Sequence, residues 1–188
     1  MKPKWWERSK KYLSKKDKVM YRLLKSYKGH LTTRKNFFYS LSRSIISQQI
    51  SVSAADSVFS KFEKKCRGKI KPKVVSKLSI SDLRKCGLSK MKAIGIKSLS
   101  EKLLNKSFNP NLIKTMSDEE AITYLSSLRQ IGRWSSEMVL IFFYNRPNIW
   151  PVQDIGLLRS ISNNYNKRYL PPKSFVNKLQ KKFSPYCT

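Results

Sequence analysis

Apolar side chains recur every three or four residues along much of the chain, which is the spacing of one buried face of an α-helix. Two such stripes follow one another, formed by Phe38, Leu41 and Ile45 and by Val52, Ala55, Phe59 and Phe62. Gln48 and Gln49 separate the two stripes. The sequence therefore predicts a helix, a short loop that contains both glutamines, and a second helix.

Polar residues with the spacing of helix caps indicate where several helices begin. Ser117 and Glu120 have the spacing of a full capping box, and Ser53 and Asp56 resemble a second one. Ser89 precedes a further helical stripe and is expected to cap it. These residues predict one helix after another.

The last third of the chain continues the helical pattern. The continuous apolar run over 139–144 follows Trp134 and Met138 at helical spacing, which favours a buried helix over a strand. Two consecutive prolines precede a final amphipathic helix, which Pro185 ends. Because no strand pattern of comparable length occurs, the predicted fold class is all-α.

The charge of the chain indicates its class of partner. Its 188 residues include 40 Lys and Arg against 11 Asp and Glu, a net charge of +29, while 40% hydrophobic residues suffice for a core. Such a field attracts DNA, RNA or anionic membranes. The longest apolar run is far shorter than the roughly 20 residues of a membrane span. We therefore expect a soluble cytoplasmic protein that is associated with nucleic acid.

Cysteine and histidine offer little chemistry. Cys66, Cys86 and Cys187 are odd in number and widely spaced, which indicates reduced thiols and excludes a four-cysteine zinc or iron-sulfur site within this chain. The single histidine, His30, has no partner motif around it and is expected in a solvated loop.

Two helices predicted over 118–129 and about 134–144 are joined by the short segment 130–133, so they must form an antiparallel hairpin. Gly132 permits the tight turn. The turn leads into a helix N-terminus, where backbone amides and the Ser135 hydroxyl could receive a phosphate. From these residues alone, an ordinary helical hairpin without a ligand is the favoured interpretation.

Four blocks of the chain share a pattern with one known family: LSRSIISQQISVSAADSVF, LRKCGLSKMKAI, LSSLRQIGRWSSEM and RPNIWPVQDIGLLR. In this order they resemble the helix-hairpin-helix DNA glycosylase superfamily, and the Gln-Gln loop resembles its alkylation-repair branch. The resemblance implies two intertwined helical lobes with the site between them. Residues 36–144 would form the core lobe with the hairpin, and residues 1–35 with 145–188 the second lobe of a single glycosylase domain. The final helix of the family is expected to be absent after Thr188.

The resemblance also implies an activity in base excision repair. A member of this branch flips an alkylated purine, such as 3-methyladenine or 7-methylguanine, out of double-stranded DNA and hydrolyses its N-glycosidic bond, leaving an abasic site. It implies a monomer without a membrane partner and without a required cofactor or iron-sulfur cluster. A Na⁺ or K⁺ ion at the hairpin is expected on the main-chain carbonyls of Ser126, Leu128 and Ile131.

Hydrolysis of this bond passes through a sugar cation, which a carboxylate can stabilise. By its position alone, Asp154 is an ordinary helix N-cap, whereas the resemblance places the catalytic aspartate there. Glu137 is expected to make a structural hydrogen bond or salt bridge. Trp134 stands where strand-nicking members carry a Schiff-base lysine, so no lyase activity is expected.

The resemblance assigns the remaining site residues. Trp134 and Met138 would line the base pocket, and the less favoured alternative is that Trp134 fills the core of the hairpin. Gln49 would enter the gap left by the flipped nucleotide while Gln48 supports the loop, and the alternative for both is a simple helix break. The hairpin would bind DNA, and the residues expected to contact it are Ile131, Gly132, Arg133 and Ser135. Gln130 replaces the first glycine that is usual in the family's hairpin.

Two other functions are compatible with parts of the sequence. A noncatalytic helix-hairpin-helix module would bind DNA through Gly132 and the basic surface, without needing Asp154 or Trp134. A general RNA-binding protein would rely on charge alone, and no strand signature for RNA recognition is visible.

Overall fold

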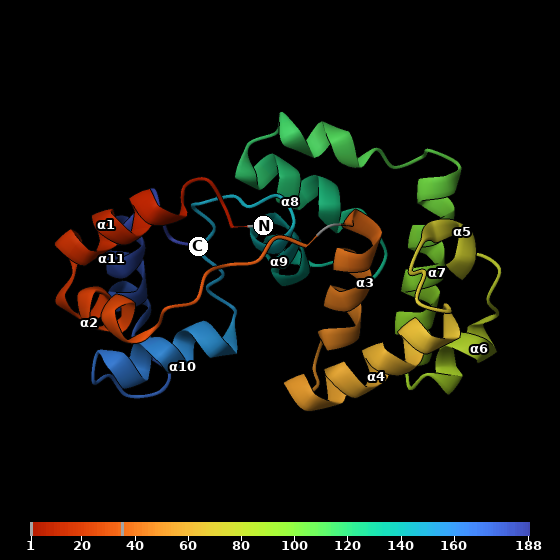
Figure 1. The fold of residues 1–188 in the computed structure, drawn as a ribbon, viewed down its shortest axis with the longest axis horizontal. Coiled ribbons are helices and arrows are strands. Elements are labelled where there is room, and N and C mark those ends of the chain that lie inside the picture. Colours follow the sequence, from red (N-terminus) through yellow and green to blue (C-terminus); the bar gives the residue numbers. More distant parts are fainter. Residues whose placement is uncertain (1, 35) are drawn as a thin grey trace. The chain divides into compact units, whose positions relative to one another are not determined.

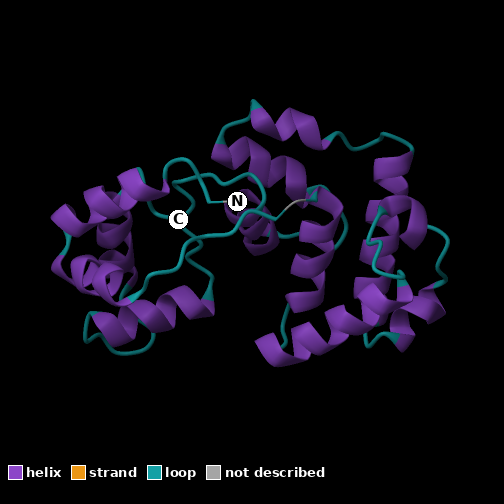
Figure 2. Cartoon of the chain, in the orientation of Figure 1, coloured by secondary structure: helices purple, strands orange, loops and turns teal. Residues whose placement is uncertain are grey.

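The computed structural model describes residues 2–34 and 36–188. Over these residues the chain forms helices joined by loops and no strand (Figure 2), so the all-α prediction is confirmed. None of the helices in this part of the chain is long and apolar enough to span a membrane.

Figure 1 shows the helices coloured along the sequence. Their bounds are α1 Trp6–Lys16, α2 Lys18–Ser26, α3 Phe37–Ser47, α4 Val52–Lys65, α5 Pro72–Val75, α6 Ile80–Lys85, α7 Lys90–Leu104, the 3₁₀ helix η1 Pro110–Lys114, α8 Asp118–Ser126, α9 Arg133–Phe142, α10 Ile155–Asn164 and α11 Lys173–Phe183. The chain divides into two compact units, one over Arg34–Val139 and one that combines the residues up to Thr33 with Leu140–Thr188.

In the unit over Arg34–Val139, α7 packs against α3, α5 and α6, and α3 also packs against α4. The predicted helix-loop-helix is confirmed, because α3 ends at Ser47 and α4 begins at Val52. Most of the two apolar stripes faces inward, and the completely or almost completely buried members include Phe38, Leu41, Ile45, Ala55, Phe59 and Phe62. The prediction is wrong for Val52, which begins α4 and is 78% exposed. Burial of these faces is the main term that stabilises helices of this length.

The capping predictions have mixed outcomes. Ser117 and Glu120 form the full capping box at the start of α8 as predicted, and Ser89 caps α7. The box predicted at Ser53 is wrong. Ser51 caps α4 instead, because its backbone is extended (φ −65°, ψ 159°) and its Oγ accepts a hydrogen bond from the Ala54 N–H.

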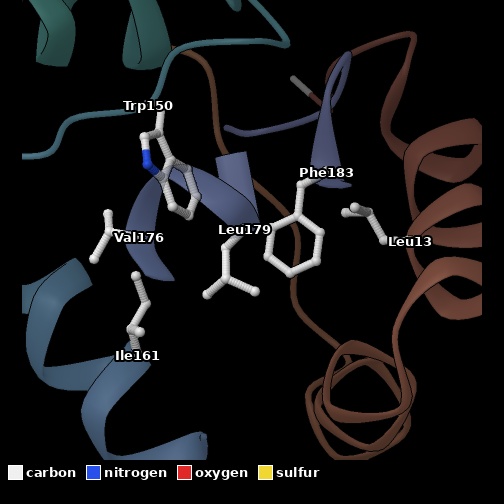
Figure 3. Close-up of a cluster of buried hydrophobic side chains, with 6 residues drawn as sticks. All are labelled: Leu13, Trp150, Ile161, Val176, Leu179 and Phe183. Atoms are coloured by element: carbon white, nitrogen blue, oxygen red, sulfur yellow. The ribbon is translucent and has the colours of Figure 1, made fainter. Parts of the chain in front are cut away.

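The other unit is built from both ends of the chain. α1 packs against α2 and α11, and a buried cluster joins them to α10 (Figure 3). Its members are Leu13, Trp150, Ile161, Val176, Leu179 and Phe183. The Trp150 ring meets the Phe183 ring edge-on at a centroid distance of 6.2 Å. α11 ends at Phe183, shortly before Pro185, as the sequence predicts.

A buried carboxylate separates α1 from α2. Asp17 caps α2 by accepting a hydrogen bond from the Met20 N–H, and it also accepts from Tyr165 Oη at 2.9 Å and from Lys182 Nζ at 2.6 Å. Burial opposes ionisation of Asp17, but these donors outweigh it and lower its pKa. Asp17 thus links the first two helices to α11.

Candidate functional site

The hairpin consists of α8, α9 and the connection over 127–132, so its helices are slightly shorter than predicted. Within the connection the Ile131 N–H donates to the Leu128 carbonyl at 3.1 Å, and Gln130 has a positive φ of 65°. At Gly132 nothing lies within 4 Å of the position that a Cβ would occupy. A phosphate can therefore approach the backbone closely at the start of α9.

Arg133 braces the hairpin. Its guanidinium donates to both carboxylate oxygens of Glu119, at 2.9 and 2.6 Å, and its Nε donates to Glu137 at 3.1 Å. The hydrogen bond to Glu119 is the main reason why the pKa of Arg133 is raised and that of Glu119 lowered. The salt bridge expected of Glu137 is confirmed, whereas the brace to Glu119 was not foreseen. Arg133 therefore brings little uncompensated charge to the hairpin.

Gln48 connects the glutamine loop to the hairpin. Its Nε2 donates to the Gln130 carbonyl at 2.8 Å and to Ser135 Oγ at 2.9 Å. Ser135 is only 2% exposed, so its hydroxyl is enclosed by the protein rather than open to solvent. It serves instead as an anchor for the loop.

The second glutamine of the pair lies in a different environment. Gln49 is exposed and has a left-handed backbone with φ 57°. Two apolar side chains beside it are also exposed, Ile50 at 40% and Val52 at 78%. The loop therefore holds Gln48 inward and presents Gln49 at the surface.

Trp134 and Met138 lie one turn apart on α9, so they share one face of the helix. Both are half-buried, while the residues between them, Ser135, Ser136 and Glu137, are buried. Trp134 therefore keeps part of its surface exposed beside the hairpin turn.

Asp154 is the N-cap of α10, as its position in the sequence predicts. It is half-buried, and its Oδ1 accepts a hydrogen bond from the Leu157 N–H at 2.8 Å. A Cβ added at Gly156 would lie 3.0 Å from the same Oδ1. The buried Trp150 anchors the segment that leads to Asp154 (Figure 3). The capping bond orients the carboxylate, and the glycine at position 156 leaves the space beside Oδ1 open.

The described residues contain no group of three or more His, Cys, Asp or Glu that could hold a metal ion. Cys66, Cys86 and Cys187 are unbridged, and burial raises the pKa of Cys66 to about 11. These are properties of structural rather than reactive thiols. His30 lies exposed in a loop, as expected.

Two contributors to this site were missed by the sequence analysis, and both lie on α7. Lys92 Nζ donates to the carbonyls of Ile46 and Gln48, and Gly95 lies against Gln130. An isolated glycine within a helical pattern is a known signal of close packing, so Gly95 could have been singled out. Nothing in the sequence distinguishes Lys92 from its many neighbours of the same charge.

The described residues combine an all-helical fold, a hairpin with an open backbone at a helix start, and a carboxylate at the next helix N-terminus. Residues 42–185 match the family model described as HhH-GPD superfamily base excision DNA repair protein. The chain belongs to this superfamily.

The names of two relatives agree with membership of this superfamily. The chain is 33% identical over 150 residues to an alkylbase DNA glycosidase-like protein of Schizosaccharomyces pombe, covering 78% of this chain and 70% of the relative. It is 31% identical over 180 residues to DNA-3-methyladenine glycosylase 1 of the same yeast, covering 91% and 77%. The solved structure of a 3-methyladenine DNA glycosylase from that yeast, in complex with abasic DNA, superposes with a TM-score of 0.83 at 27% identity. That match covers 95% of this chain and 90% of the other.

Proposed function

We propose that this protein is a monofunctional DNA glycosylase that removes alkylated purines, such as 3-methyladenine and 7-methylguanine, from double-stranded DNA. The single observation that carries the proposal is the Asp154 carboxylate, held at the start of α10 by the Leu157 N–H, in a chain of a base excision repair superfamily. The names of the relatives support the class of substrate.

In the proposed mechanism the hairpin binds a phosphate of the DNA backbone. The backbone at Gly132 faces a phosphate at the positive end of the α9 dipole, where no side chain blocks the approach. Ile131 lies beside this phosphate and shapes the turn, because its own N–H donates to the Leu128 carbonyl. Arg133 acts mainly by holding the hairpin in shape, because Glu119 and Glu137 already engage its guanidinium. Ser135 acts through its bond from Gln48.

Gln49 occupies the gap that the flipped nucleotide leaves in the duplex. It is exposed on a loop whose neighbour Gln48 is fixed by two hydrogen bonds. Flipping costs a few kcal/mol, and a side chain that fills the vacated stack stabilises the opened duplex.

Trp134, with Met138 one turn away, receives the flipped base. A purine alkylated on a ring nitrogen carries positive charge, and stacking on the indole contributes about 0.5–2 kcal/mol of cation-π attraction. Since a tryptophan stands where a Schiff-base lysine would be needed, the reaction stops at the abasic site.

Asp154 stabilises the sugar cation as the N-glycosidic bond breaks. The bonding electron pair leaves with the alkylated base and neutralises its charge. Water then adds its oxygen to the anomeric carbon and gives a proton to the carboxylate or to solvent. The products are the free base and an abasic site.

The proposed enzyme is a cytoplasmic monomer that needs no cofactor and holds no iron-sulfur cluster. A Na⁺ or K⁺ ion would sit on the carbonyls of Ser126, Leu128 and Ile131 and steady the hairpin. These residues fit such a hard cation in donor type, because they offer backbone oxygens from the end of α8 and the turn that follows. The Leu128 carbonyl, which already accepts from the Ile131 N–H, keeps a second lone pair for it.

Single-turnover release of free 3-methyladenine and 7-methylguanine from methylated duplex DNA tests the proposal. The parent is compared with Asp154→Asn and with Asp82→Asn, which removes a carboxylate from another helix start. Release should fall by at least about a hundredfold in Asp154→Asn alone, with duplex binding retained in all three. Binding without release by the parent would favour the noncatalytic DNA-binding module.

A further inference from the structure

The Lys92 ammonium holds the end of α3. It lies on the first turn of α7 and donates to the Ile46 carbonyl at 2.9 Å and to the Gln48 carbonyl at 2.7 Å. Carbonyls at a helix C-terminus lack intrahelical partners and carry partial negative charge, so a cation there satisfies both needs. Lys92 is half-buried, and this burial lowers its pKa.

Gly95, one turn further along α7, lies against the hairpin turn. A Cβ at this position would lie 2.8 Å from Gln130 Cγ, 2.9 Å from Gln130 Cβ and 3.3 Å from the Arg129 carbonyl oxygen. The first two distances are shorter than real contacts allow. Any side chain at position 95 would therefore push the hairpin turn away from α7.

These contacts form a closed ring. Lys92 holds the backbone of Gln48, the Gln48 side chain donates to the Gln130 carbonyl, and the Gln130 side chain packs on Gly95. The ring begins and ends on α7, so this one helix sets the spacing between the glutamine loop and the hairpin turn.

We propose that Lys92 and Gly95 are positioning residues that hold the loop of Gln49 at a fixed distance from the phosphate-binding hairpin. This inference rests on the proposed function, in which the hairpin grips the backbone while Gln49 fills the vacated stack. Both contacts must be made on one duplex at the same moment. An error of about 1 Å in such an arrangement can cost about a hundredfold in rate.

The same helix contains a matched control. Lys97 Nζ donates to the carbonyls of Ser76 at 3.1 Å and Leu78 at 2.7 Å. Lys97 thus makes the same pair of bonds as Lys92, but to a loop that takes no part in the proposed DNA contact. Lys97→Met removes an equivalent pair of hydrogen bonds. It leaves the closed ring of contacts through Lys92 and Gly95 intact.

The test compares the parent, Lys92→Met, Lys92→Arg and Lys97→Met. For each, the unfolding midpoint, the affinity for undamaged duplex and the single-turnover release of 7-methylguanine are measured. Release is followed from a paired duplex and from a duplex with an abasic site opposite the lesion, where flipping is easier. A 2-aminopurine beside the lesion reports base unstacking by its fluorescence.

Lys92→Met should slow release from the paired duplex by about tenfold, and by less than about threefold from the duplex with the opposing abasic site. The fluorescence rise should weaken in parallel, while affinity for undamaged duplex stays within about twofold. Lys92→Arg should recover most of the parental rate. Lys97→Met should release the base as fast as the parent, although it should lose about as much stability as Lys92→Met.

The inference is overturned if Lys92→Met and Lys97→Met slow release equally, or if the loss is the same on both duplexes. Absence of release by the parent would instead refute the proposed function. If Lys92→Met does not fold, the pair Gly95→Ala and Gly95→Ala/Gln130→Gly decides. The single variant should be slow and the added glycine, which suits the positive φ of Gln130, should restore the rate. A double variant as slow as the single one would contradict the inference.

Discussion

Gln48 donates a hydrogen bond from Nε2 to Ser135 Oγ at 2.9 Å, although 87 positions separate the two residues in the chain. The bond joins the loop after α3 to the first turn of α9. A polar side chain that interrupts an apolar stripe therefore has a definite partner, which is the condition for burying it. It also makes the position of the glutamine loop depend on the hairpin.

This bond predicts coupling between the two residues. In a double-mutant cycle with Gln48→Met and Ser135→Ala, the free energies of unfolding should be non-additive by about 1 kcal/mol. Urea unfolding of the parent, both single variants and the double variant measures the coupling. Additive effects would show that the bond contributes nothing to stability.

Gly156→Ala is expected to separate stability from activity. Alanine favours the helix over glycine by up to about 1 kcal/mol, so the unfolding midpoint should stay level or rise. The new Cβ would lie 3.0 Å from Asp154 Oδ1, which displaces the carboxylate and should slow base release by about tenfold. Asn163→Ala, at an exposed position of α10, is the control and should leave the rate unchanged. A Gly156→Ala variant of parental rate would disprove the link between Gly156 and the carboxylate.

Trp134 is expected to favour the release of positively charged bases over neutral ones. Trp134→Ala should slow release of cationic 7-methylguanine by about tenfold more than release of a neutral purine such as hypoxanthine, because only the cation loses attraction to the indole face. Trp134→Phe should retain part of the difference. Single-turnover rates on both lesions measure the ratio, and equal losses would mean that the ring only fills space.

The lowered pKa of Asp17 predicts that the protein loses stability in acid. Its pKa is lower in the folded protein than the ordinary value of about 3.9, because Lys182, Met20 and Tyr165 donate to the ionised form and outweigh burial. Its stabilisation is therefore complete above about pH 5 and disappears as the pH falls through the folded pKa.

Asp17→Asn should lower the free energy of unfolding by about 2 kcal/mol at pH 7, and the difference from the parent should shrink below about pH 4. Urea unfolding between pH 3 and pH 7 measures it. Asp56→Asn, which removes an exposed carboxylate that pairs with Arg43, is the matched control for the loss of one charge. A difference that is constant with pH would contradict the assignment.

The sequence by itself determined most of the helices and the position of the hairpin. The stripes around Phe38 and Phe59, the capping box at Ser117 and the N-cap at Asp154 depend on contacts within a few residues, so their signals are local. The cap at Ser51 was missed because Ser53 offers an equally suitable side chain, and only the backbone conformation distinguishes the two. The motifs around the hairpin also indicated the family, and the match of residues 42–185 to the family model confirmed it.

Only the tertiary structure decided how the site residues are held. The brace from Arg133 to Glu119, the burial of Ser135 and the ring through Lys92 and Gly95 join residues from different helices. In a chain with 40 Lys and Arg, no local pattern singles out Lys92 as a lysine that faces the carbonyls at the end of α3. The partners of a side chain depend on which helices pack together, and that packing is a property of the whole fold.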